Sequence, residues 1–325
     1  MKYGLLICIF ICSMLAVNAQ STVHASSFTV SQDGTADFKT IQAAIYAVRD
    51  LSQQQVTIHI KKGIYREKIV IPSWKTNITL EGEDAGNTMI TYDDYAGKRL
   101  AARDEFLKAD SIRTYTSYTL LIEGNGCGIK NLTIRNTAGR VGQAVALHVE
   151  GDRFTAINCR LLGNQDTFYA ATENSRQYYK DCYIEGTTDF IFGEAIVLFS
   201  NCTVKSLSNS YITAAATRPG QPFGFVFMDC TLIADSAATK VYLGRPWRPY
   251  AKTVFIRTEM GNHIVKQGWD NWRNPANEST VLYAEYKSYG AGADSSSRAK
   301  WSRQLSKKEL KKYIVKNIFN GWQPG

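Results

Sequence analysis

The sequence predicts an all-β fold, a right-handed parallel β-helix (solenoid) with short capping helices at its ends. Three observations favour this fold: a short motif recurs every twenty-odd residues, strand-like runs are separated by Gly, Asn and Asp, and helical periodicity is confined to two segments. A solenoid adds its hydrophobic core coil by coil, so a chain of 325 residues fits one elongated domain.

The first residues are typical of a secretory signal peptide. Lys2 supplies a positive start, residues 5–17 form an apolar run, and Val17-Asn18-Ala19 places small residues before a cleavage point. The apolar run is shorter than the roughly 18–20 residues that a membrane-spanning helix needs. We therefore expect a signal peptide over 1–19, a single domain over 20–325, and no membrane association after cleavage.

A helix is predicted directly after the start of this domain. The apolar positions that follow Asp37 have helical spacing: Phe38, Ile41, Ala44, Ile45, Val48 and Leu51. The first coil of a solenoid otherwise exposes apolar side chains and strand edges. We expect this helix to cap that open end.

Short apolar or alternating runs predict strands along the rest of the chain. They are bounded by Gly, Asn and Asp, which favour turns. The clearest runs are residues 56–60, 78–80, 119–122, 144–149, 195–199 and 241–243.

Four segments share the pattern Asn or Asp, then Cys, any residue, and an aliphatic residue, and a fifth has Leu in place of Cys. They begin at Asn131, Asn158, Asp181, Asn201 and Asp229, which lie 27, 23, 20 and 28 residues apart. The Cys and the aliphatic residue are two positions apart, so in a strand both point to the same face. Each repeat is interpreted as one coil, with the cysteines forming an inward ladder of small buried side chains.

Five cysteines remain after loss of the signal peptide, so they cannot all form pairs. They contain no C-x-x-C motif, which leaves a zinc ribbon or a redox motif unsupported. One disulfide, Cys202 with Cys230, is expected in an oxidising compartment.

The last helical segment begins with a capping box. Ser306-Lys307-Lys308-Glu309 has this pattern, and Leu310 and Ile314 continue the helical spacing.

The net charge favours a polyanionic partner. The whole chain carries +9, and loss of Lys2 with the signal peptide leaves +8. Nucleic acid, a membrane surface and an acidic polysaccharide all satisfy this charge. No nucleic-acid-binding motif is found and export argues against that partner, so an acidic extracellular polymer is favoured.

Two aspartates have the same position within successive coils. Asp166 and Asp189 are 23 residues apart, and each lies seven residues after its coil's cysteine, Cys159 or Cys182. Neighbouring strands are about 4.8 Å apart, and two carboxylates that close cannot ionise equally. One is expected to keep its proton and act as an acid, while the other is an anion able to attack. For either residue alone, a backbone cap in a turn is the alternative.

Five segments resemble the signature blocks of the pectin methylesterase (pectinesterase) family, in the family's order. They are Gly63-Ile64-Tyr65-Arg66-Glu67, Gly142-Gln143-Ala144-Val145-Ala146-Leu147, Gln165-Asp166-Thr167, Asp189-Phe190-Ile191-Phe192-Gly193 and Leu243-Gly244-Arg245-Pro246-Trp247. The resemblance extends from the first helix to past Trp269. It implies a parallel β-helix catalytic domain without a metal or an organic cofactor.

The resemblance also implies a function and roles. The expected reaction is hydrolysis of the C6 methyl esters of methyl-esterified homogalacturonan (pectin), giving de-esterified pectin and methanol. Asp189 becomes the nucleophile, Asp166 the general acid and then base, and Arg245 the partner that orients Asp189. Gln143 and Gln165 become the donors that stabilise the oxyanion, a role that neutral amides can perform.

Aromatic residues are expected to bind the sugar rings. The resemblance places Trp247 and Trp269 in the substrate cleft and Tyr115 more weakly, and Phe190 and Tyr169 are expected to line the site. The protein is expected to be a monomer, secreted to the extracellular space, the cell wall or the periplasm according to its host.

The chain departs from the plant pattern at two points. Leu132 stands where plant members have a cysteine, which leaves Cys159 unpaired, and no inhibitory pro-region is expected before the catalytic domain. Two alternatives stay open: another β-helix enzyme, either a pectate lyase or a polygalacturonase, and a non-catalytic pectin-binding protein. A serine esterase is disfavoured because the sequence has no G-x-S-x-G motif.

Overall fold

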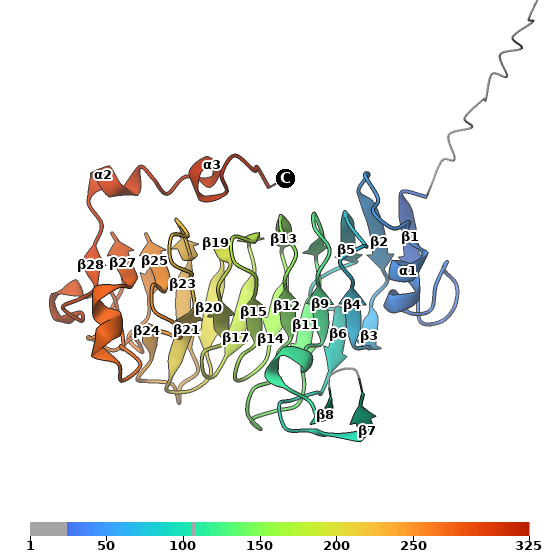
Figure 1. The fold of residues 1–325 in the computed structure, drawn as a ribbon, viewed down its shortest axis with the longest axis horizontal. Coiled ribbons are helices and arrows are strands. Elements are labelled where there is room, and N and C mark those ends of the chain that lie inside the picture. The colour runs from blue at the N-terminus through green and yellow to red at the C-terminus, as the bar shows by residue number, and fades with distance from the viewer. Residues whose placement is uncertain (1–24, 106–107, 325) are drawn as a thin grey trace, which may run out of the picture.

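Three parallel sheets wind along one axis in the computed structural model, which describes residues 25–105 and 108–324 (Figure 1). The signal peptide expected over residues 1–19 lies outside the described residues. Each coil in the middle of the solenoid contributes one strand to each sheet, and every pair of neighbouring strands in these sheets is parallel. The predicted parallel β-helix is therefore confirmed.

The strands fall into sheets that we call A, B and C. Sheet A contains β1 (Ser27–Val30), β2 (Val56–Ile60), β5 (Ile78–Gly82), β10 (Gly128–Lys130), β13 (Phe154–Ile157), β16 (Arg176–Lys180), β19 (Ile196–Ser200), β22 (Phe225–Met228), β25 (Lys252–Ile256), β27 (Leu282–Tyr286) and β28 (Arg303–Gln304). Sheet B contains β3 (Gly63–Arg66), β6 (Thr88–Tyr92), β11 (Thr133–Asn136), β14 (Arg160–Leu162), β17 (Tyr183–Gly186), β20 (Thr203–Ser206), β23 (Thr231–Ala234) and β26 (Glu259–Met260). Sheet C contains β4 (Ile69–Ile71), β9 (Leu120–Ile122), β12 (Leu147–Val149), β15 (Phe168–Ala170), β18 (Ile191–Gly193), β21 (Tyr211–Ala215) and β24 (Tyr242–Pro246). Each of the six strand-like runs overlaps one of these strands.

The recurring Asn or Asp marks the turn from sheet A to sheet B. These residues all have φ between 51° and 56°: Asn131, Asn158, Asp181, Asn201 and Asp229. Asn and Asp adopt this left-handed conformation more readily than other residues with a side chain, which explains the repeat. The Cys or Leu that follows and the aliphatic residue two positions later are buried in the core, as the pattern predicts.

The predicted disulfide is wrong, because the five described cysteines are free and buried. The Cys202 thiol lies 3.5 Å from the carbonyl of Tyr179, and the Cys230 thiol lies 3.5 Å from the carbonyl of Phe199. Each thiol thus contacts a backbone acceptor of the preceding coil and fills the core as a small apolar side chain.

The N-terminal helix has the expected place. Helix α1 (Ile41–Ala47) begins after Thr40, whose hydroxyl accepts a hydrogen bond from the backbone N–H of Ala43. Ile41, Ala44 and Ile45 are fully buried, and the helix lies at the end of the solenoid formed by the first strands (Figure 1). It caps that end, as predicted.

The C-terminal helices have a different place from the one predicted. The capping box of Ser306 and Glu309 is present, but α2 (Lys307–Leu310) ends early and is followed by α3 (Val315–Ile318). These helices lie along the outside of sheet A rather than over its last coil (Figure 1). The reason is that β19, β22 and β25 are apolar on both faces, and the outer face packs against buried side chains of the C-terminal segment: Leu305, Tyr313, Ile318 and Phe319.

The remaining elements lie in loops. They are an antiparallel hairpin, β7 (Arg99–Asp104) with β8 (Ala109–Ser111), and the short 3-10 helices η1 (Thr114–Thr116), η2 (Pro275–Ser279) and η3 (Ser295–Ser297). The hairpin projects from the body of the solenoid (Figure 1). No helix among the described residues combines the length and the apolar character needed to cross a membrane.

Candidate active site

A cleft of about 320 Å³ lies on the outer face of sheet C. All five predicted catalytic residues line it, together with aromatic and small side chains. The lining consists of Thr114, Tyr115, Gln143, Gln165, Asp166, Asp189, Phe192, Ala214, Arg245, Trp247 and Trp272. Residues separated by more than one hundred positions in the sequence therefore meet because successive coils stack.

The two aspartates occupy equivalent positions in neighbouring coils. β15 pairs with β18 so that Tyr169 lies opposite Phe192, and the same offset of 23 residues relates Asp166 to Asp189. Both have positive φ, 63° and 48°, in the bend before their strands. The backbone N–H of Asp166 donates to the carbonyl of Thr188 at 3.1 Å. This geometry agrees with the stacking predicted from their spacing.

Arg245 holds Asp189 through two hydrogen bonds. Its Nε donates to Oδ1 at 3.0 Å and its Nη2 donates to Oδ2 at 2.6 Å. The guanidinium lies between two aromatic rings, 3.9 Å from the ring centroid of Tyr211 and 3.7 Å from that of Trp272. Stacking on both faces and a fork of two charge-assisted bonds fix the carboxylate of Asp189 in one orientation.

Burial raises the pKa of both aspartates, and Arg245 makes their protonation differ. Desolvation, followed by the charge of Asp189, raises the pKa of Asp166 from 3.8 to about 8, so its carboxyl is protonated at neutral pH. Desolvation also raises the pKa of Asp189, but the hydrogen bonds and the charge of Arg245 oppose that rise. The cleft therefore contains a proton donor next to a carboxylate that Arg245 stabilises as an anion.

The two glutamines enter the cleft from consecutive coils. Gln143 and Gln165 form a parallel bridge, and the backbone N–H of Ala144 donates to the carbonyl of Gln165 at 3.1 Å. Both line the cleft beside the aspartates. Their positions are suited to donors for an oxyanion that forms on a bound carbonyl compound.

Two of the predicted sugar-binding aromatics line the cleft and a third supports it. Tyr115 is 46% exposed and lies 5.3 Å from the ring of Tyr169. Tyr169 is buried and stacks on Phe192 at 4.6 Å, and Phe192 contacts Trp247 at 5.9 Å. Tyr115 and Trp247 therefore line the cleft, while Tyr169 forms part of the packing beneath it.

The predictions for Trp269 and Phe190 are wrong, because both side chains are fully buried in the core. Trp269 bridges to Gly244 and packs its ring 4.6 Å from Tyr283, so it continues an inward row of the solenoid. Phe190 points inward where Gly186 leaves room for its Cβ. Trp272 lines the cleft in the place expected for Trp269.

We expect Trp269→Ala to lower the free energy of unfolding by about 3–5 kcal/mol, because it empties a large core site. Trp272→Ala is the matched control, since Trp272 is partly exposed and should lose much less. Denaturant unfolding of both variants measures this difference. Equal losses, or a larger loss for Trp272, would contradict the assignment of Trp269 to the core.

Sequence reasoning missed four residues that line the cleft, namely Thr114, Phe192, Ala214 and Trp272. It also missed Tyr211, which packs against the guanidinium of Arg245. Only Phe192 carried a usable signal, since it follows inward-facing Ile191 in a strand and must point outward. Trp272 has φ 60° in an irregular loop, where no periodicity applies. Among the described residues, no group of three or more His, Cys, Asp and Glu is placed to hold a metal ion.

The pectinesterase family model matches residues 27–322 of this chain. The chain belongs to the pectinesterase family. It is thus an ester hydrolase, and its relatives include Pectinesterase 31 of Arabidopsis thaliana, 36% identical with 88% of this chain and 89% of that protein covered. Putative pectinesterase 11 of the same plant is 39% identical, with 90% and 78% covered.

Solved structures agree with this family. The pectin methylesterase from carrot has a TM-score of 0.83 and 32% identity, with 93% of this chain and 95% of that chain covered. Pectin methylesterase PemA from Erwinia chrysanthemi has a TM-score of 0.79 and 30% identity, with 94% and 99% covered. This chain thus has relatives of known structure in a plant and a bacterium.

Proposed function

We propose that this pectinesterase hydrolyses the C6 methyl esters of homogalacturonan, releasing methanol and de-esterified pectin. The observation that carries the proposal is the pair of hydrogen bonds that Arg245 donates to Asp189. Asp166 lies beside this pair, and its raised pKa keeps its carboxyl protonated at neutral pH. A net charge of +9 over the whole chain supports an acidic polymer as substrate. A solved pectin methylesterase related to this chain binds a hexasaccharide.

In the first half of the reaction, a carboxylate oxygen of Asp189 attacks the ester carbonyl carbon. Negative charge develops on the carbonyl oxygen, where the side-chain amides of Gln143 and Gln165 donate hydrogen bonds. The bond to the methoxy oxygen breaks, and Asp166 gives its proton to that oxygen, so methanol leaves. The sugar is now joined to Asp189 as an anhydride.

In the second half, Asp166 is an anion and takes a proton from water. The water oxygen attacks the sugar's carbonyl carbon, and the bond to Asp189 breaks. Asp189 returns to its carboxylate form, Asp166 is protonated again, and the sugar leaves as a carboxylate with release of one proton to solvent. Because the oxyanion donors are neutral amides, the anionic product is held less tightly than it would be by cationic donors.

The test is to incubate the purified protein with highly methylated pectin and measure methanol together with new unsaturated or reducing ends. Methanol with unchanged chain length supports the proposal. Chain cleavage without methanol would replace it with a lyase or a polygalacturonase. Binding of pectin without any product would indicate a non-catalytic binding protein.

The proposal includes secretion as a monomer after removal of residues 1–19. The apolar run after Lys2 supports this export. N-terminal sequencing of the exported protein and its mass in solution test both statements.

The activity should depend on pH in a bell-shaped manner. We expect kcat/KM to fall above about pH 8, because Asp166 then loses the proton that it gives to methanol. On the acid side, kcat/KM should fall as Asp189 becomes protonated. Initial rates between about pH 4 and 10, with folding checked at each pH, measure this profile. Constant activity from pH 7 to 10 would contradict the role of Asp166 as acid.

A further inference from the structure

One connection between sheets B and C is much longer than its neighbours. It runs from Tyr92 at the end of β6 to Leu120 at the start of β9, whereas β14 and β15 are joined by residues 163–167. This excursion, defined as residues 93–117, contains the exposed hairpin β7–β8 and then η1. Thr114 and Tyr115 of η1 line the cleft, so one of its walls lies on this excursion.

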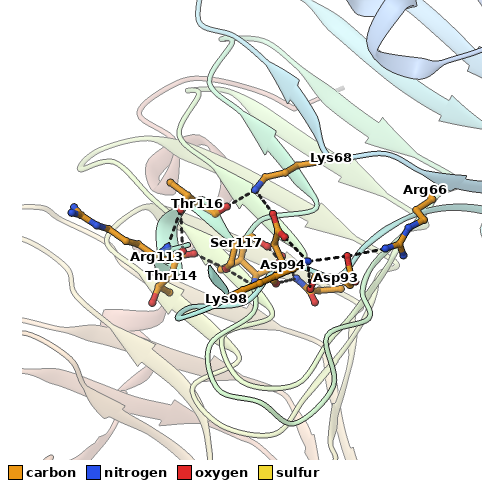
Figure 2. Close-up of polar contacts among 11 residues, drawn as sticks. Arg66, Lys68, Asp93, Asp94, Lys98, Arg113, Thr114, Thr116 and Ser117 are labelled. Atoms are coloured by element: carbon orange, nitrogen blue, oxygen red, sulfur yellow. Dashed lines mark hydrogen bonds and ion pairs between the residues drawn. The ribbon is translucent and has the colours of Figure 1, made fainter. Parts of the chain in front are cut away.

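Asp94 lies at the base of the excursion between two lysines (Figure 2). Its side chain is 10% exposed, and it accepts from Lys68 Nζ at 2.5 Å through Oδ2 and from Lys98 Nζ at 2.9 Å through Oδ1. Lys68 Nζ also donates to the backbone carbonyl of Thr116 at 2.6 Å. Lys68 thereby joins the first residues of the excursion to η1 at its end.

The same base is joined to the coil that carries Gln143. The amide of Asn136 is buried, and its Nδ2 lies within hydrogen-bond distance of the carbonyls of Asp94 at 2.9 Å and Ser117 at 3.1 Å. Two residues after Asp94, the backbone N–H of Ala96 donates to the carbonyl of Gln143 at 2.9 Å. The wall with Tyr115 and the backbone of Gln143 therefore share this anchoring network.

The core of the solenoid does not depend on the excursion. The large core cluster of the described residues includes Ile90 and Leu120 on either side but no residue of 93–117. The strands of the hairpin are mostly exposed and provide little packing. Besides the buried side chain of Ile112, polar contacts at the base hold η1 in position. Loss of the Asp94 charge would leave Lys68 without its carboxylate partner and Lys98 with only Asp93, at 3.4 Å.

We propose that Asp94 is a positioning residue that holds the Thr114–Tyr115 wall of the cleft against the bound polymer through Lys68 and Lys98. This inference depends on the proposed function. Tyr115 faces the substrate, and none of these residues touches the reacting ester. Gln143 keeps its parallel bridge to Gln165 when Asp94 is changed, so the effect is on substrate binding. Asp94→Asn should raise KM for methylated oligogalacturonate about tenfold and change kcat by less than about twofold.

The experiment compares KM and kcat of wild type, Asp94→Asn, Tyr115→Ala and the double variant. Because Asp94 acts through Tyr115, Asp94→Asn should add less than about twofold to KM in the Tyr115→Ala background. A residue with only a structural role would add its full effect in both backgrounds. Asp235→Asn is the matched control, since it removes another Asp–Lys pair, 2.6 Å from Lys205, and should leave KM unchanged.

A second variant keeps the inference testable if Asp94→Asn does not fold. Lys98→Met removes one ammonium group from a side chain that is 34% exposed and keeps an unbranched chain one atom shorter, and it should raise KM about threefold. An unchanged KM in either variant, or full additivity with Tyr115→Ala, would overturn the role of Asp94. Failure of the proposed function is distinguishable, because wild type itself would then release no methanol.

Discussion

Asp189→Ala should lower kcat for methanol release about 10⁴-fold or more, the largest effect expected of any single substitution in this protein. Asp189 is the proposed nucleophile, so its removal should stop formation of the anhydride. Arg245 donates its two hydrogen bonds to Asp189, and neither Asp166 nor water is held in this way. Methanol release under saturating methylated pectin measures kcat. Asp189→Asn, which keeps the shape of the side chain but cannot attack, should lose nearly as much.

The control for this substitution is Asp229→Asn. Asp229 also accepts two hydrogen bonds from an arginine, both at 2.6 Å from Arg257, but this pair is at the surface. We expect its kcat to remain within about twofold of wild type, since exposed ion pairs contribute little. Residual activity above about 1% in Asp189→Ala would show that Asp189 is not the nucleophile.

The fold was predictable because its turns impose a chemical requirement on the sequence. Five successive coils bend from sheet A to sheet B through one residue at positive φ, and each has Asn or Asp there, which are favoured in this conformation. The small or aliphatic residues that follow fill the space between coils. The pattern starting at Asn158 and Asp181 therefore predicts both the turn between the sheets and the register of neighbouring coils. This register brings Asp166 beside Asp189.

The same reasoning fails where the chain leaves regular strand geometry. Phe190 and Phe192 differ by two positions and should share a face, but the bend at Asp189, with φ 48°, turns Phe190 inward and leaves Phe192 in the cleft. Trp269 and Trp272 lie in an irregular segment where spacing does not determine burial. The family resemblance, applied by position, could not tell which of these two tryptophans lines the cleft and which is buried in the core.

Loops that have no repeat were the least predictable part of the site. The wall formed by Thr114 and Tyr115 depends on the excursion of residues 93–117, whose position is set by contacts of Asp94, Lys68 and Asn136 from three different coils. The residues of such a network are ordinary charged and polar types in the sequence. Their role in positioning the wall can be recognised only when the stacked coils bring them into contact.

Asp166→Asn is expected to lower activity and raise stability together. The amide cannot give a proton to methanol or take one from water, so kcat should fall about 10²- to 10⁴-fold. The raised pKa of Asp166 means that burial disfavours its charged form. The folded state thus keeps a proton that the unfolded state loses between pH 3.8 and about 8, and wild-type stability falls as pH rises through this window.

The neutral amide removes this cost, so Asp166→Asn should be more stable than wild type by about 2–4 kcal/mol near pH 8, with a gain that shrinks toward zero near pH 4. Denaturant unfolding of both proteins at several pH values measures the gain. Asn tolerates the positive φ of 63° at this position, and Asp229→Asn, with φ 56°, controls for the substitution itself. A gain that does not depend on pH would indicate that Asp166 is ionised in the folded protein, and the assignment of the acid would then have to be abandoned.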